Sequence, residues 1–166
     1  MVNGMKYAPL TALAMVVVAC AQPNERPASP DPAFADLQAR GAEAMGVDQY
    51  TSTHVFESLP DGGRIVLQRD RSDAAGTATI RAHMRDIAAR FAAGDFSIPG
   101  MVHAQAVPGT DVMTVRKAFI RYVADTLPRG ARVSIVTTDS AALAAVHAFL
   151  AFQRMDHRAG GHAHDE

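Results

Sequence analysis

The feature that most constrains the fold of this chain is an internal repeat. Residues 54–68 align without a gap with residues 122–136 (HVFESLPDGGRIVLQ and YVADTLPRGARVSIV), and the dipeptide Leu-Pro occurs at the same place in both. In each copy, two β-prone runs flank a turn sequence, which predicts a β-hairpin. A helical pattern of apolar residues follows each copy. We therefore expect a hairpin–helix unit to occur twice, over about residues 51–94 and 118–157.

This duplication predicts an α+β domain with two layers. The order ββα-ββα most simply builds an antiparallel sheet of about four strands with both helices on one face. The first helix is expected from about Thr77 to Ala93 and the second after a cap at Asp139 or Ser140. If the two helices are aligned with a four-residue deletion, His83 on the first lies opposite His147 on the second.

Two further segments of the domain show helical patterns. Asp31-Pro32 is typical of a helix start, and the apolar pattern after it predicts a short helix that stops at Gly46. The apolar residues of segment 112–127 also fit a helix, but the repeat requires a strand at Tyr122. We expect a helix or loop to about Lys117 and a strand afterwards.

Length and composition restrict the classes of protein. The chain has 166 residues, which suits one domain, and its 48% apolar and 20% charged residues are typical of a globular protein. With 16 basic and 17 acidic side chains the formal net charge is −1, which argues against nucleic acid as a partner. Cys20 is the only cysteine, so an intrachain disulfide, a thiolate metal site and a cysteine nucleophile are excluded.

The first nineteen residues have the pattern of a signal peptide. Lys6 precedes an apolar run over residues 8–19, which is too short to span a bilayer as a mature helix. The run ends in Val-Val-Ala-Cys20, which resembles the lipobox of bacterial lipoproteins. The resemblance implies a lipid on Cys20, cleavage after Ala19 and acylation, for example with palmitate, of the new amino terminus. Translation starts at Met1 or at Met5; the pattern fits both.

The expected domain organisation follows from this leader. Residues 1–19 are the signal peptide, residues 20–33 a lipidated cysteine with a proline-rich tether, residues 34–158 one α+β domain, and residues 159–166 a histidine-rich tail. Ala21, rather than Asp, follows Cys20. By similarity to known sorting rules, the protein would face the periplasm from the outer membrane in an organism that has two membranes.

Histidines are the most evident candidates for a ligand site. His83 and His147 lie on the apolar stripes of the two long helices, His103 lies in a predicted loop, and His54 lies on the first strand. If the two helix histidines point inward and meet near a pseudo-twofold axis, a transition metal site results, with copper, zinc or haem as the group it would hold. Further ligands considered are Met101 and the histidines at or in the tail, which are His157, His162 and His164.

A structural role for the same histidines is the competing interpretation. An imidazole on the inner face of a helix is commonly a hydrogen-bonded core residue, and a histidine tail is commonly a solvated segment. In that case the chain would be a structural or protein-interaction lipoprotein with an envelope protein as its partner. A contiguous apolar patch on the free sheet face would favour this alternative.

Catalytic motifs are not found in the sequence. The chain has no Gly-x-Ser-x-Gly elbow, no phosphate-binding Gly-x-x-x-x-Gly-Lys loop and no His-Glu-x-x-His helix. We therefore expect a binding protein that is not an enzyme.

Several short sequence motifs of the domain resemble those of a family of small exported bacterial proteins whose function is not established. They span roughly residues 51–157 and include Ile80-Arg-Ala-His83, Gly94-Asp-Phe-Ser97, Val102-His103, Pro108-Gly109, Leu127-Pro128, Val136-Thr-Thr-Asp139 and Val146-His-Ala-Phe149. The family pattern has histidine at the positions of His54, His83, His103 and His147. Some members carry the label aspartate carbamoyltransferase, but this chain lacks the Ser-x-Arg-Thr phosphate motif of that enzyme. Some have Met-Pro-Gly where this chain has Val107-Pro-Gly, so a thioether ligand there is missing.

Overall fold

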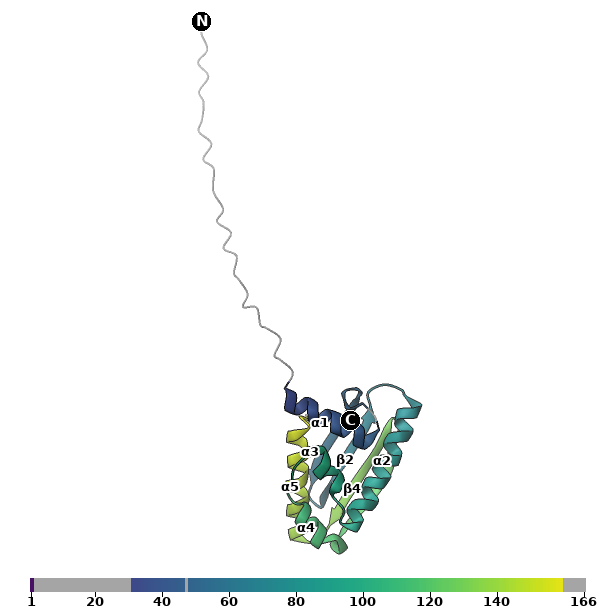
Figure 1. Ribbon diagram of the computed structural model, residues 1–166, viewed down its shortest axis with the longest axis vertical. Helices are drawn as coiled ribbons and strands as arrows, with labels where there is room; N and C mark the ends of the chain where they lie inside the picture. The colour runs from purple at the N-terminus through teal and green to yellow at the C-terminus, as the bar shows by residue number, and fades with distance from the viewer. Residues whose placement is uncertain (2–30, 47, 160–166) are drawn as a thin grey trace.

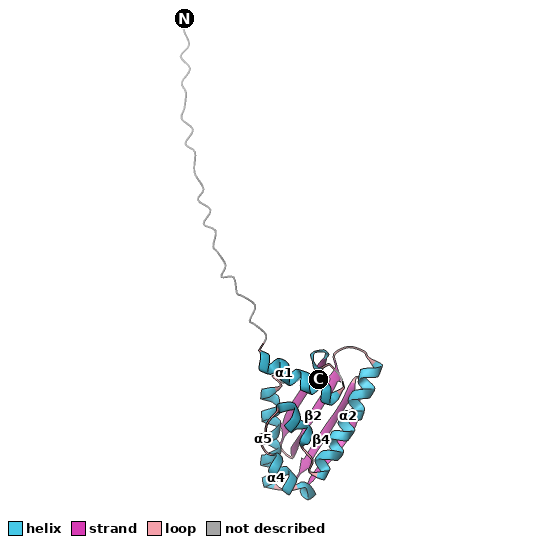
Figure 2. Ribbon diagram, in the orientation of Figure 1, coloured by secondary structure: helices cyan, strands magenta, loops and turns pink. Residues whose placement is uncertain are grey.

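The computed structural model describes residues 31–46 and 48–159, together with Met1. Figures 1 and 2 show an antiparallel sheet with the helices packed on one side of it. This arrangement confirms the predicted α+β class with a duplicated hairpin–helix plan. Cys20, the leader, most of the tether, His162 and His164 lie outside the described residues.

The sheet contains the two predicted hairpins. Strands β1 (Ser52–Leu59) and β2 (Gly62–Arg69) form the first hairpin, and β3 (Ile120–Leu127) and β4 (Gly130–Thr137) form the second. The strand order is β1-β2-β4-β3, and every neighbouring pair is antiparallel. The two repeats therefore join through their second strands, which lie in the middle of the sheet.

Each long helix covers the hairpin of the other repeat. Helix α2 (Ala74–Ala93) packs mainly against β3 and β4, whereas α5 (Ser140–Asp156) packs mainly against β1 and β2. Both helices begin with an aspartate cap, in which Asp73 accepts from the backbone N–H of Gly76 and Asp139 from that of Ala142. The core between helices and sheet contains the residues with the least exposure, including Leu67, Ile80, Phe91, Val133, Ile135, Val146, Phe149 and Leu150.

Three shorter helices complete the helical layer. Helix α1 (Pro32–Met45) has the predicted cap at Asp31 and ends at Gly46, whose φ of 69° is in the left-handed region that favours glycine. Helix α3 (Ser97–His103) packs against α1. Helix α4 (Thr110–Val115) and the 3₁₀ turn η2 (Lys117–Phe119) precede β3, as predicted for this segment. The expected loop around His103 was wrong, because that residue ends helix α3.

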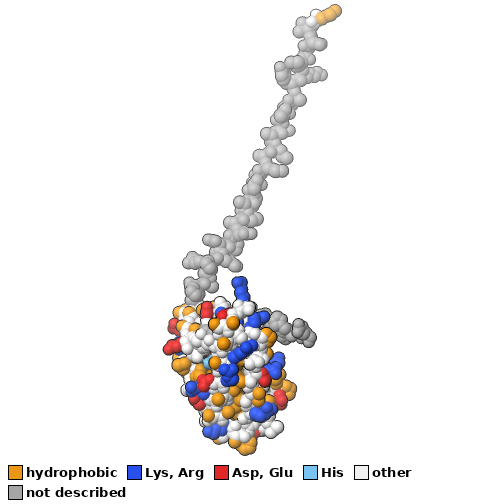
Figure 3. Space-filling model, turned by 90° about the vertical axis from the view of Figure 1, so that its right-hand side faces the viewer, with side chains coloured by type: hydrophobic (Ala, Val, Ile, Leu, Met, Phe, Trp, Pro, Cys, Tyr) orange, Lys and Arg blue, Asp and Glu red, His pale blue; other side chains and the backbone are white. Residues whose placement is uncertain are grey.

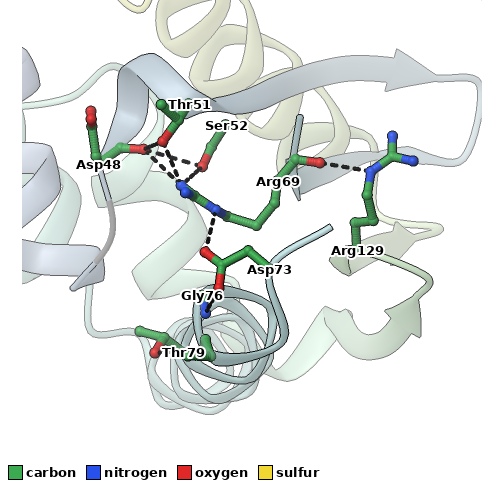
Figure 4. Close-up of polar contacts among 9 residues, drawn as sticks. Asp48, Thr51, Ser52, Arg69, Asp73, Gly76, Thr79 and Arg129 are labelled. Carbon is green, nitrogen blue, oxygen red and sulfur yellow. Dashed lines mark hydrogen bonds and ion pairs between the residues drawn. The ribbon is translucent and has the colours of Figure 1, made fainter. Parts of the chain in front are cut away.

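Arg69 fixes the turn that leads from α1 into the sheet. Its Nη1 donates to the 3₁₀ turn η1 (Gln49–Thr51) and its flanks, at 3.2 Å to the carbonyl of Asp48 and 2.7 Å to Oγ1 of Thr51 (Figure 4). Its Nε lies 3.0 Å from Oδ2 of Asp73, the cap of α2. One guanidinium thus connects the approach to β1 with the start of α2, and the end of α1 gains a defined position over the sheet.

The surface and the open sheet face are mixed in character. Figure 3 shows acidic and basic side chains scattered among apolar ones on the side of α2. On the sheet face away from the helices, valines alternate with two ion pairs, Arg64–Glu57 and Arg132–Asp125. Among the described residues, no helix combines the length and the hydropathy that crossing a membrane requires.

Candidate functional site

A small cavity lies between the sheet and the helices α1, α2, α3 and α5. Its volume is about 80 Å³, and most of its wall is apolar, with Phe56, Leu67 and Ile87 among the lining residues. Four histidines line the same cavity, which are His54, His83, His103 and His157. Of the four histidines predicted as principal ligands, three therefore lie at one cavity, and His147 does not.

His54 projects from β1 into this cavity toward the end of α1. Its Nε2 lies 3.4 Å from Sδ of Met45, the last residue of α1. Its ring stacks on that of His157 with centroids 5.4 Å apart. Burial, together with the nearby His83, lowers the pKa of His54 to about 4. The side chain is therefore a neutral imidazole at neutral pH.

His157 follows the last turn of α5 and lies beside His54. The sequence indicated a tail position, but the ring packs against Phe56 with centroids 5.4 Å apart and against His103 with centroids 5.0 Å apart. Burial, with His54 and His103 close by, lowers its pKa to about 3. Its Nδ1 is buried and has no hydrogen-bond partner in the described part of the chain. A buried polar atom in this state needs a partner that a ligand can supply.

His103 is held by hydrogen bonds on both sides of its ring. Nδ1 lies 2.5 Å from Oδ2 of Asp156, and Nε2 lies 2.8 Å from Oε1 of Gln153. The residue is only 5% exposed. Because both nitrogens already have partners, neither is available to bind a metal ion, and the ring packs edge-on against that of His157.

His83 lies on α2 at a half-buried part of the cavity wall. Burial lowers its pKa, while Asp86 acts in the opposite direction. His83 is therefore one of the imidazoles that border the cavity.

His147 lies away from the cavity, so the expected pairing with His83 was wrong. Its Nε2 donates to the carbonyls of Leu59 and Gly62, at 2.9 and 3.0 Å, in the turn of the first hairpin. In the other repeat, Arg81 donates to the carbonyls of Leu127 and Gly130, at 2.6 and 3.2 Å. These contacts are equivalent, so the structural counterpart of His147 is Arg81.

Aligning the helices by their caps changes which residues of the two repeats are equivalent. With the caps Asp73 and Asp139 superposed, His157 corresponds to Phe91, and on the strands His54 corresponds to Tyr122. Phe91 and Tyr122 form an aromatic edge contact with centroids 5.8 Å apart. The imidazole pair therefore occupies the position that an aromatic pair fills in the other repeat.

The remaining predicted ligands are not brought to the cavity. Met101 is 49% exposed on α3, and the tail residues His162 and His164 lie outside the described residues. Within residues 31–46 and 48–159, no group of three or more His, Cys, Asp or Glu side chains is placed to hold a metal ion. Met45 and Gln153 also line the cavity but were not predicted from the sequence. Each lies near the C-terminal end of its helix, α1 or α5, and only this position could have indicated that the two residues share a cavity.

Comparisons of this chain with models of protein families, with curated proteins and with solved structures found no match. The function proposed below therefore rests on the geometry of the cavity.

Proposed function

We propose that this chain is an exported, lipid-anchored protein whose domain binds a transition metal ion through the imidazoles of His54 and His157. The observation that supports this function best is the pair itself, because two stacked neutral imidazoles line one cavity and one buried nitrogen has no partner. Neutral imidazole is the form that binds zinc and copper. His83 lines the same cavity from α2, and the ring of His103 packs against that of His157.

The repeat supports a functional role for these imidazoles. The fold needs side chains of this size at the two positions, but Tyr122 and Phe91 meet the same need without an imidazole. Buried imidazoles also destabilise the protein in acid, because their protonated form is excluded from the cavity. A pair that the fold does not require, and that has this cost, is best explained by a ligand.

An ion suits the cavity better than haem does. Its volume of about 80 Å³ is well below the roughly 300 Å³ at which pockets for organic ligands begin. A protein-interaction role for the open sheet face has less support, because two ion pairs interrupt its valines. Export and lipid attachment at Cys20 rest on the lipobox resemblance, and the mass of the mature amino terminus tests them.

The test is metal titration of the full-length chain in detergent. Every sample carries Cys20→Ser, His162→Ala and His164→Ala, which removes the thiol and the two tail imidazoles as competing ligands. We expect one-to-one binding of zinc or copper by calorimetry, a raised melting temperature, and no binding of haemin. His54→Gln and His157→Gln should each weaken binding by at least about tenfold.

The matched control is His147→Gln, because it removes an imidazole that lies on a hairpin turn. It should leave metal affinity unchanged, with circular dichroism confirming that each variant is folded. The absence of binding by a folded parent protein would contradict the proposed function, as would equal affinity in the His54, His157 and His147 variants.

A further inference from the structure

One contact at the cavity joins a nitrogen and a sulfur atom. Nε2 of His54 lies 3.4 Å from Sδ of Met45. With metal–nitrogen and metal–sulfur bonds of about 2.0 and 2.3 Å, two atoms at this distance subtend about 105° at a shared metal ion, close to the tetrahedral angle. The pair is thus spaced as two ligands of one ion before any ion binds.

The segment that follows Met45 folds back against α1. Gln49, just after α1, donates from Nε2 to the carbonyl of Gln38 at 3.0 Å. Its side chain lies so close to Gly41 that a Cβ there would come within 1.4 Å of Nε2. Met45, the last residue of α1 before Gly46, is 9% exposed and borders the cavity.

The ligand types favour one metal in one oxidation state. Thioether sulfur is a soft ligand that selects Cu(I), whereas Zn(II) sites use three or four His, Cys, Asp or Glu ligands. The described residues contain no such group of three. Cu(II) prefers tetragonal nitrogen and oxygen ligands, and an apolar wall that includes Phe56 and Leu67 offers few of them.

We propose that the cavity is a Cu(I) site in which Sδ of Met45 and Nε2 of His54 are two of the ligands, with His157 as the neighbouring imidazole. This inference rests on the proposed function and specifies its metal. Copper bound there connects the end of α1 with β1 and so ties the first helix to the sheet.

The experiment measures Cu(I) affinity without oxygen, by competition with the chromophoric chelator bicinchoninate. It uses the full-length chain with Cys20→Ser, His162→Ala and His164→Ala, and compares Met45→Leu with Met84→Leu. Met84 lines the same cavity from α2 and is 2% exposed, so it is a matched buried thioether, while Met45 is the one whose Sδ lies 3.4 Å from Nε2 of His54. We expect Met45→Leu to weaken Cu(I) binding by at least about tenfold, and Met84→Leu to leave it within about twofold.

X-ray absorption of the copper-loaded protein gives an independent readout. A sulfur neighbour at about 2.3 Å should be present in the parent protein and in Met84→Leu, and absent in Met45→Leu. Equal Cu(I) affinity in the two leucine variants, or a spectrum without sulfur in the parent, would overturn the Cu(I) site. Zinc binding that depends on His54 but not on Met45 would do the same while leaving the proposed function intact. If the parent binds no metal at all, both proposals fail.

Discussion

The two repeats place different side chains at equivalent positions of one scaffold. Where β3 meets α2, Tyr122 and Phe91 pack edge to face, with their ring centroids 5.8 Å apart. Where β1 meets α5, the equivalent residues are His54 and His157, with centroids 5.4 Å apart. The comparison separates what the fold needs, which is two rings between a strand and a helix, from what only one repeat has. The imidazole pair is found in one repeat only, so the fold itself does not require it.

The largest expected effect concerns a feature that both repeats share. Gly62 and Gly130 start β2 and β4, and a Cβ at either would lie 2.0 Å from a carbonyl oxygen of the neighbouring central strand, that of Ile135 or Leu67. We expect Gly62→Ala and Gly130→Ala each to lower the free energy of unfolding by about 3 kcal/mol or more. Urea unfolding at neutral pH measures both.

Similar losses of stability in the two variants would show that the two repeats contribute equally to the contact between β2 and β4. A loss below about 1 kcal/mol in either variant would contradict the close approach of the two central strands at that glycine.

The next effect is a pH dependence of the stability that only the repeat positions occupied by His54 and His157 should cause. The pKa of His54 is lowered to about 4 and that of His157 to about 3. An unfolded histidine titrates near 6.5, so below this pH the unfolded chain binds protons that the folded protein does not. The stability is complete above pH 6.5 and decreases as the pH falls toward 4, by about 3 kcal/mol for a histidine shifted this far.

Urea unfolding of the metal-free protein from pH 7.5 to 4.5 measures this decrease. His157→Phe copies the residue of the other repeat and should make the pH dependence clearly shallower. Phe91→Tyr is the matched change in the other repeat, because it alters a ring without adding a group that titrates in this range. A His157→Phe protein with the same acid sensitivity as the parent would argue against the burial of that imidazole.

A smaller effect is expected where the repeats cap each other's hairpins. Arg81 donates to three carbonyls, and His147 to two, of a turn in the opposite repeat. Removing either donor leaves part-buried carbonyls without these bonds, so Arg81→Ala and His147→Ala should each cost about 1–2 kcal/mol.

The double variant sharpens this comparison. Because the two side chains bind different turns, the losses should add to within about 0.5 kcal/mol. A strong coupling between them would show that the two turns do not act as independent ends of the sheet. Thermal unfolding of the two single variants and the double variant measures the coupling.

Much of the fold was predictable because its signals are local. The turn sequences around Leu59-Pro60 and Leu127-Pro128 indicated the hairpins, and the caps Asp31 and Asp139 with the end at Gly46 indicated helix boundaries. Helix α3 was missed because Pro99-Gly100 has the composition of a loop. Proline in the first turn of a helix loses no backbone bond, so tertiary packing could still form one there.

The candidate site was predictable only in part. His54, His83 and His103 were named from the sequence and lie at one cavity, but the pairing of His83 with His147 failed. The helices align by their caps, two residues away from the alignment that would superpose these two histidines. A shift of two residues turns a side chain to another face of a helix, so periodicity alone could not decide the partner.

The sequence by itself determined the repeat, the order of hairpins and helices, and the number of histidines available, because turn chemistry and apolar periodicity act over a few residues. Only the tertiary structure decided that each helix covers the opposite hairpin, that His157 lines the cavity beside His54, and that Met45 meets His54. These contacts join segments distant in the chain, and their geometry depends on packing between elements, which no local pattern encodes.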